Sequence, residues 1–308
     1  MRVMFWGTPE FAAPSLRALV GEGFDVCAVV TRPDKPVGRD RVLTAPPIKR
    51  VALEESLPLF QPESPRDEDF AGLLGAVAPD LSVVVAYGHI LPRTIIDLPR
   101  LGTLNIHASL LPALRGASPI QAAIRQGLTE TGVTIMRMVT ALDAGPVVLQ
   151  SRTPMPDDET YGELQGRLAE LGALALIEAL ALIELGRTRE RAQEDSLATY
   201  APKVDREITR IDWSLDAGQV ANAIRAYDPR PGAWGRFNDA DIKIFGARRS
   251  FGVSGRPGEV LSVDAEGLVI ACRTGAVRVC DVQPSGKRRM QAVEWHRGRG
   301  ISTGDVLA

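Results

Sequence analysis

The sequence predicts two domains, an α/β domain built on a mainly parallel sheet and a smaller β-rich domain after it. The chain has 308 residues, which is more than one hydrophobic core usually spans. Roughly the first 155 residues alternate apolar, β-branched runs with helical patterns, and this alternation is typical of a mainly parallel sheet with crossover helices. Beyond residue 207, short strand-like runs lie between glycines and turns, which indicates a small β barrel or sandwich.

The elements of the first domain can be placed in order. The apolar run at 2–7 predicts a buried strand, and the helical pattern after it, at 9–23, ends near a glycine. Further strands are expected at 25–31, 58–62, 81–87, 102–109, 132–139 and 146–153, and helices at 48–56, 67–78, 118–127 and 159–186.

The second domain follows a charged, irregular stretch at 187–207. A short helix is expected at 216–227, and strands at 233–238, 242–247, 259–265, 267–272 and 276–282. Two segments do not fit the regular pattern. Residues 31–47 form an expected long loop with four prolines and four cationic side chains, and residues 283–300 are strongly basic. Long loops inside compact domains are commonly functional or disordered.

Charge and composition narrow the functional classes. The net charge is -2, but residues 201–308 carry 17 Lys and Arg against 13 Asp and Glu, which indicates an anionic partner for the second domain. The three cysteines fit no metal motif and lie in apolar runs, so we expect reduced core residues in a reducing compartment. The N-terminus does not resemble a signal peptide, and the longest apolar helical run is interrupted by Glu178 and Glu184. A cytoplasmic protein without a membrane span is therefore expected.

Asn105 and His107 are the strongest candidates for chemistry. They are two apart on an expected strand, so their side chains share one face, and the strand ends directly after them. Ligands of open α/β sheets bind beyond the carboxyl ends of the strands. An amide can donate to a developing oxyanion, and an imidazole can move a proton near neutral pH. Asp143, in a turn between two strands, is the candidate for a carboxylate that favours the protonated imidazole.

Simpler explanations compete with this interpretation. His107 could be a structural histidine with satisfied hydrogen bonds, Asp143 could simply form a turn, and the basic loop could be a solvated surface. The sequence has no Ser or Cys nucleophile motif, and its three histidines are too widely spaced for a metal site. The chemistry indicated is direct transfer of a small acyl group to an amine, without a covalent enzyme adduct and without a metal.

A series of motifs resembles one family. The segments GTPEFA, TRPDKPVGR, VVVAYGHILP, LNIHASLLPALRGASPIQAAI, ETGVTIMRM, LDAGPVVLQ, YAPKVDREITRIDW and QPSGKRRM occur in this order across nearly the whole chain. Together they resemble the methionyl-tRNA formyltransferases. The central segments by themselves are similar to the wider 10-formyltetrahydrofolate-dependent enzymes, including glycinamide ribonucleotide and sugar-amine formyltransferases. Trp6 and the pair Thr140 and Ala141 depart from the family pattern.

The resemblance implies a fold, a domain division and site residues. It implies a Rossmann-like formyltransferase domain at 1–188, a linker at 189–206 and an OB-like, tRNA-binding β-barrel domain at 207–308. Asn105, His107 and Asp143 match the catalytic trio. The pterin of the folate would be held largely by backbone around Tyr87, Gly88, Ile90 and Leu91 and by the loop from Val139 to Asp143. The formyl site would be shaped by Ser109, Leu110, Leu111 and Pro112. Phe11 would recognise the methionyl side chain, and Arg39, Lys287 and Arg288 would contact the tRNA.

The activity implied is transfer of the formyl group of 10-formyltetrahydrofolate to the free α-amine of methionyl-initiator tRNA, by a monomer. Asn105 and a protonated His107 would stabilise the oxyanion. Two alternatives stay open: a formyltransferase for a small amine such as an amino sugar, and an RNA-binding protein on an inactive catalytic scaffold.

Overall fold

The computed structural model describes residues 1–38 and 40–308, apart from the side chain of Glu68. The chain divides into two compact units. The first comprises Met1–Gly116, Gly132–Thr153 and Gln165–Tyr200, and the second comprises Ala117–Thr131, Pro154–Leu164 and Ala201–Ala308. The domain boundaries expected at 188 and 207 stay predictions.

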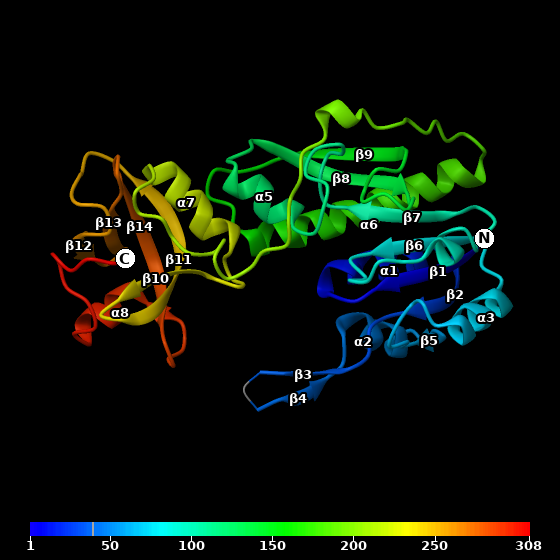
Figure 1. The fold of residues 1–308 in the computed structure, drawn as a ribbon, viewed down its shortest axis with the longest axis horizontal. Helices are drawn as coiled ribbons and strands as arrows, with labels where there is room; N and C mark the ends of the chain where they lie inside the picture. Colours follow the sequence, from blue (N-terminus) through cyan, green and yellow to red (C-terminus); the bar gives the residue numbers. More distant parts are fainter. Residues whose placement is uncertain (39) are drawn as a thin grey trace. The chain divides into compact units, whose positions relative to one another are not determined.

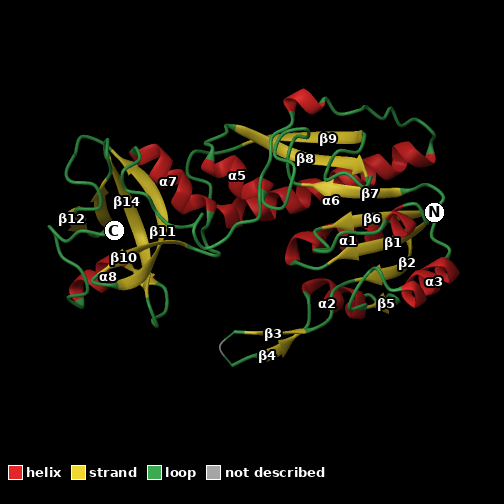
Figure 2. Cartoon of the chain, viewed as in Figure 1, coloured by secondary structure: helices red, strands yellow, loops and turns green. Residues whose placement is uncertain are grey.

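A seven-stranded sheet forms the centre of the first unit (Figures 1 and 2). Its strands are β1 (Arg2–Gly7), β2 (Asp25–Val30), β5 (Leu59–Phe60), β6 (Leu81–Val85), β7 (Thr103–His107), β8 (Glu130–Arg137) and β9 (Val147–Pro154), in the order β5-β2-β1-β6-β7-β8-β9. The neighbours from β5 to β7 are parallel, and β8 is antiparallel to β7. The predicted Rossmann-like, mainly parallel sheet is confirmed.

Helices flank this sheet. They are η1 (Glu10–Ala12), α1 (Ala13–Gly21), α2 (Pro47–Glu54), α3 (Glu68–Val77), α4 (Arg93–Ile96), η2 (Asp195–Leu197) and the long α6 (Tyr161–Glu184). The sequence pattern missed α4 because a single helical turn has too few residues to show a period. Within residues 1–38 and 40–308, no helix combines the length and hydropathy needed to cross a membrane.

Strand β7 buries one face against α6 and leaves the other for chemistry. An ideal Cβ on Gly172 of α6 would lie 3.1 Å from Ile106 Cγ2, so the helix backbone packs closely on this residue. Side chains alternate along a strand, so Asn105 and His107 project from the opposite face. The shared face expected from their spacing is therefore present.

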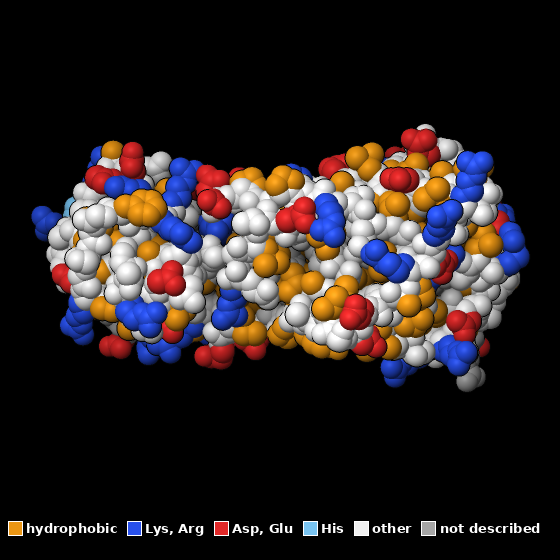
Figure 3. Space-filling view, turned by 90° about the horizontal axis from the view of Figure 1, so that it is seen from above, with side chains coloured by type: hydrophobic (Ala, Val, Ile, Leu, Met, Phe, Trp, Pro, Cys, Tyr) orange, Lys and Arg blue, Asp and Glu red, His pale blue; other side chains and the backbone are white. Residues whose placement is uncertain are grey.

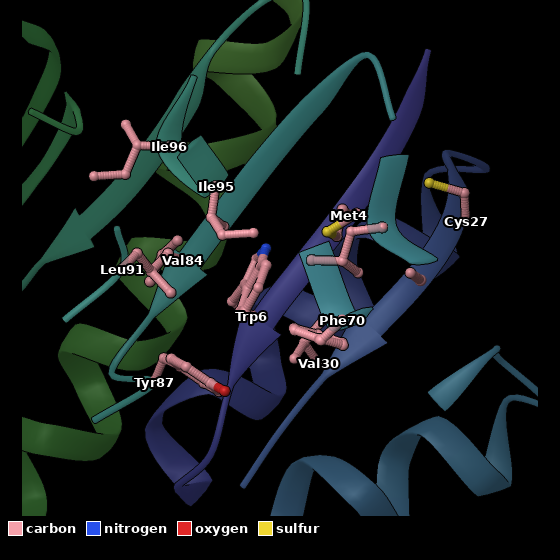
Figure 4. Close-up of a cluster of buried hydrophobic side chains, with 12 residues drawn as sticks. Met4, Trp6, Cys27, Val30, Phe70, Val84, Tyr87, Leu91, Ile95 and Ile96 are labelled. Carbon is pink, nitrogen blue, oxygen red and sulfur yellow. The ribbon is translucent and has the colours of Figure 1, made fainter. Parts of the chain in front are cut away.

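A cluster of buried aromatic and aliphatic side chains lies beside β1 (Figure 4). The Trp6 ring packs edge-on against Tyr87 and Phe70, with centroid distances of 5.2 and 6.1 Å. Trp6, which departs from the family pattern, is thus a core residue beneath the loop that follows β6. Because the Tyr87 side chain is buried in this cluster, the loop meets solvent through its other residues.

The stretch at 31–47 is more ordered than expected. Strands β3 (Lys35–Val37) and β4 (Val42–Thr44) form a two-stranded antiparallel sheet with Lys35 opposite Thr44 and Val37 opposite Val42. The expectation of an irregular loop was wrong on this point. Three-residue strands rich in proline and charge give no recognisable two-residue alternation.

The second unit is built on an antiparallel sheet. Strands β10 (Ala233–Phe237), β11 (Ala240–Ser250), β14 (Ala276–Pro284), β13 (Gly267–Ala271) and β12 (Val260–Asp264) pair in this order, and β15 (Met290–Gln291) pairs with β14. Helices α5 (Pro119–Arg125), α7 (Ala217–Ala226) and α8 (Ala292–Arg297) complete it. A capping box from Asp216 and Gln219 starts α7. The predicted β-rich second domain is confirmed, and its sheet is antiparallel, whereas α8 inside the basic segment was missed.

The cysteines differ in burial. Cys27 and Cys272 are buried thiols, as expected, but Cys280 is exposed on β14. The expectation that all three are core residues was wrong for Cys280. Strand β14 alternates between the core and solvent, and position 280 falls on the solvent side.

Candidate active site

The site lies where β7 ends. Strands β6 and β7 are parallel neighbours, so the loops that follow them leave the same edge of the sheet. Asn105 and His107 are at this edge, and the turn containing Asp143 follows β8, which pairs with β7 on its other side. This turn places Asp143 beside a histidine that lies 36 residues earlier in the chain.

His107 is held in one tautomer. Its side chain is buried, and its Nε2 lies 3.0 Å from the carbonyl oxygen of Leu114. A carbonyl oxygen only accepts, so Nε2 carries a hydrogen and donates it. Nδ1 is therefore the nitrogen that gains or loses the titrating proton.

Asp143 faces that nitrogen. Its Oδ2 lies 3.7 Å from His107 Nδ1 and accepts a hydrogen bond of 2.7 Å from the backbone N–H of Gly116. The backbone of Asp143 has φ 48°, in the left-handed region that non-glycine residues rarely adopt. The predicted pairing of the histidine with a carboxylate is present, although this distance is too long for a direct hydrogen bond.

Burial and charge act in opposite directions on His107. Desolvation lowers the pKa of His107 below its usual 6.5, while the Asp143 charge and the Leu114 carbonyl raise it by a smaller amount. The ring of the free protein is accordingly neutral near pH 7. The expectation of a protonated His107 does not fit this resting state, because sequence spacing carries no information on desolvation.

Asn105 is available to a ligand. Its side chain is half-buried, and the carboxamide has no hydrogen-bond partner among the residues that the structure describes. Asn105 and His107 leave the same face of β7, so a donor and a proton-accepting group stand side by side at the sheet edge.

The segment expected to shape the formyl site is tightly tied to β8 and β9. The Thr134 hydroxyl donates to the Ser109 carbonyl at 2.6 Å and accepts from the Leu111 N–H at 3.1 Å. The Gln150 side chain donates to the Leu111 carbonyl at 2.8 Å, and the Ser109 hydroxyl donates to the Ala113 carbonyl at 2.6 Å. Leu111 is buried, and Leu110 and Pro112 are half-buried.

The two loops expected to hold the folate expose apolar side chains. Ile90, after β6, is 77% exposed, and Val139 and Leu142, after β8, are 41% and 62% exposed. The side chains of Tyr87 and Leu91 belong to the core cluster, and Gly88 has the positive φ of 87°. The outward residues of these two loops thus offer apolar surface. Because β8 is antiparallel to β7, the loop after β8 begins beside Leu104 at the start of β7, and it reaches His107 through Asp143.

The remaining predicted residues belong to other elements. Phe11 is buried in η1, while Lys287 and Arg288 are exposed in the turn after β14. Arg39 lies outside the described residues. The face in Figure 3 mixes Lys and Arg with Asp and Glu side chains and does not gather them into one basic field.

The sequence missed several partners of the trio. Leu114 and Gly116 act through their backbone carbonyl and N–H groups, and residue identity does not reveal such contacts. Gln193, in the stretch interpreted as a linker, donates to the carbonyls of Asp143 and Gly145 at 2.8 Å each. Its oxygen accepts from the guanidinium of Arg115 at 3.1 and 2.9 Å. Local sequence patterns do not predict contacts between residues this far apart in the chain.

No group of three or more His, Cys, Asp or Glu side chains that could hold a metal occurs within the described part of the chain. The donor set at the site is one amide, one imidazole and one carboxylate, and this set is suited to moving protons and stabilising an oxyanion.

Known proteins match this chain over nearly its whole length. The formyl transferase family model matches residues 1–180, and the formyl transferase C-terminal domain model matches residues 203–300. The chain is 47% identical over 305 residues to the methionyl-tRNA formyltransferase of Aromatoleum aromaticum, which covers 99% of this chain and 96% of that protein. It is 44% identical to that of Syntrophus aciditrophicus, over 99% of this chain and 98% of that protein.

Solved structures share the fold. The methionyl-tRNA formyltransferase from Clostridium thermocellum matches with a TM-score of 0.59 and 13% identity, over 92% of this chain and 98% of that one. HypX from Aquifex aeolicus in complex with tetrahydrofolic acid matches with a TM-score of 0.66 and 22% identity over 96% of this chain. This chain spans about half of HypX, 46% of its length.

Proposed function

We propose that this chain, which belongs to the formyl transferase family and within it to the methionyl-tRNA formyltransferases, transfers the formyl group of 10-formyltetrahydrofolate to the α-amine of methionyl-initiator tRNA. The family match, which runs over nearly the full length of the curated relatives, supports the activity. The observation that carries the chemistry is the fixed His107 tautomer, with Nδ1 facing the Asp143 carboxylate beside the half-buried amide of Asn105.

Asn105, His107 and Asp143 have different roles in the transfer. Asn105 donates from its carboxamide to the formyl oxygen as negative charge develops there. His107 accepts at Nδ1 the proton that the attacking amine loses, and Asp143 stabilises the resulting imidazolium. The same nitrogen then returns the proton to the leaving N10 of the folate, which restores the neutral ring.

The loops after β6 and β8 are proposed to hold the folate. Bound 10-formyltetrahydrofolate supplies an activated formyl group on N10. The exposed Ile90, Val139 and Leu142 offer it an apolar surface, and burial of such side chains against a ring system is favourable. The fixed segment at Ser109–Pro112 lies beside the trio and limits where the formyl group can sit.

The tRNA is proposed to be held chiefly through its phosphates. The hairpin β3–β4 presents Lys35 and Arg41 together with the exposed Val37, Val42 and Leu43. Cationic side chains on a protruding hairpin suit the charged acceptor end of a tRNA. Contacts by Arg39, Lys287, Arg288 and Phe11, the monomeric state and a cytoplasmic location stay predictions.

The test is direct formylation. Purified protein is incubated with 10-formyltetrahydrofolate and methionyl-initiator tRNA, and N-formylmethionyl-tRNA is quantified, with an amino sugar as competing acceptor. His107→Gln serves as the control for contaminating activity. Preferred formylation of the amino sugar would support the small-amine alternative, and folate-independent tRNA binding without any transfer would support the inactive scaffold.

A further inference from the structure

The segment after α6 lies across the catalytic loops of the first unit. We call residues 191–200 the strap. Arg191 forms an isolated bridge with Val147, and Tyr200 forms one with Arg115. Between these ends, the Thr199 hydroxyl accepts from the Leu114 N–H at 2.9 Å. The strap therefore contacts both β9 and the loop that follows β7.

Gln193 is the strap residue that bonds to both catalytic loops. Every hydrogen-bonding position of its amide is used. Its Nε2 donates to the carbonyls of Asp143 and Gly145, both at 2.8 Å. Its Oε1 accepts from Nε and a terminal nitrogen of Arg115. An amide has two donors and two acceptor positions, so this set of partners fixes both its orientation and its identity. A glutamate has no donors for the carbonyls, and an asparagine is one methylene shorter.

The turn that Gln193 holds is one that needs support. Asp143 has φ 48°, and a strained residue of this kind persists where surrounding contacts over-determine it. Gly145 has no room for a side chain, because an ideal Cβ would lie 1.7 Å from the Arg137 carbonyl oxygen. The two bonds from Gln193 span this turn, and the Gly116 N–H donates to the Asp143 carboxylate.

Arg115 connects the strap to the histidine. Its guanidinium is buried, and besides Gln193 it binds Asp195 at 2.8 Å. Its chain neighbours carry the two backbone groups of the site: the Leu114 carbonyl accepts from His107, and the Gly116 N–H donates to Asp143. The pair of Arg115 and Gln193 thus joins the loop that orients the imidazole to the turn that presents the carboxylate.

We propose that Gln193 is a positioning residue for formyl transfer, which sets the separation between the Asp143 carboxylate and His107 Nδ1. This inference rests on the proposed function. Gln193 needs no contact with either substrate, because it acts through the backbone of the catalytic turn. Small displacements of catalytic groups lower the reaction rate, by about 10²-fold for a misplacement of 1 Å.

Two substitutions and one control separate positioning from general stability. Gln193→Met keeps the length of the side chain without a hydrogen bond or a charge. Gln193→Glu keeps an acceptor for Arg115 and removes the donors to the turn. Ser196→Ala is the matched control, because its exposed hydroxyl donates to Glu194 within the same strap.

We expect both Gln193 variants to lose about 10- to 100-fold in kcat, with KM for methionyl-tRNA changed by less than about twofold. Ser196→Ala should match the wild type. NMR of labelled histidine in Gln193→Met should give a lower pKa for His107, because the Asp143 charge that raises it moves away. The His107 pKa is measured in Gln193→Met and not in Gln193→Glu, because the charge of the new glutamate would itself shift that pKa.

The inference is overturned if both folded variants keep kcat within about twofold, or if the His107 pKa of folded Gln193→Met is unchanged within about 0.2. If Gln193→Met does not fold, the kcat of Gln193→Glu decides. The titration requires no substrate, so it tests the strap even if the wild type proves not to formylate methionyl-tRNA.

Discussion

Replacing Asp143 by asparagine removes one charge from the site and little else. The asparagine oxygen can still accept the 2.7 Å bond from the Gly116 N–H, and the carbonyl of residue 143 stays bonded to Gln193. What changes is the interaction with His107 Nδ1, 3.7 Å away. Asp143→Asn is therefore a test of the charge with the turn in place.

The magnitude follows from that separation. Two unit charges 3.7 Å apart at an effective dielectric constant of about 20 interact by about 4 kcal/mol. If the imidazolium forms during transfer, the variant loses most of this stabilisation in the transition state. At about 1.4 kcal/mol per tenfold, we expect kcat to fall by about 10²–10³-fold. The pKa of His107 should also fall further below 6.5, because the group that raises it is gone.

Steady-state kinetics with saturating methionyl-tRNA and histidine NMR measure both effects. Asp97→Asn is the control, because Asp97 forms an exposed ion pair with Arg93 away from the trio. The reasoning is refuted if Asp143→Asn keeps kcat within about threefold, or if KM for methionyl-tRNA rises while kcat is unchanged. Either result would assign Asp143 to structure or to binding and leave the proton transfer without a partner.

Other changes give separate tests. Asn105→Ala should lower kcat by about 10²–10³-fold with an unchanged melting temperature, because one oxyanion donor is lost. Gly145→Ala should destabilise the protein by roughly 1–3 kcal/mol in chemical denaturation, because its Cβ would meet the Arg137 carbonyl oxygen at 1.7 Å. Arg39→Ala should weaken methionyl-tRNA binding and make its dependence on log salt shallower by about one, with folate affinity unchanged. Because the His107 pKa is lowered in the native state, the native state binds fewer protons than the unfolded state as pH falls through about 6.5. The free energy of unfolding should therefore decrease in this pH range, and His107→Gln should reduce that decrease.

The fold and the shared strand face of Asn105 and His107 were accessible from the sequence because they rest on short-range regularities. Alternation along β7 places Ile106 against Gly172 and leaves Asn105 and His107 on the other face. The strands near them are apolar runs bounded by turn residues, and the parallel arrangement follows from their alternation with helices. Such patterns are properties of neighbouring residues and are visible without any coordinates.

Contacts between residues far apart in the sequence could not be predicted from it. Gln193 lies 50 residues from Asp143 and 78 from Arg115, so its role had no local signal, and its segment was interpreted as a linker. The same holds for the His107 tautomer, which a backbone carbonyl determines. The β3–β4 hairpin was missed for another reason, since its strands of three residues are too short to show a period.

The opposing effects on His107 are what make it suitable for a transfer that needs the same proton twice. With burial alone, the ring would be too weak a base to take the proton of the attacking amine. With a direct ion pair to Asp143, the imidazolium would hold that proton and deliver it to the leaving nitrogen reluctantly. The 3.7 Å separation is intermediate: the carboxylate stabilises the charged ring without a direct hydrogen bond to it. Because the Leu114 carbonyl occupies Nε2, uptake and delivery must both occur at Nδ1, which is the nitrogen that Asp143 faces. The distance between these two side chains is therefore the quantity on which turnover should depend most steeply.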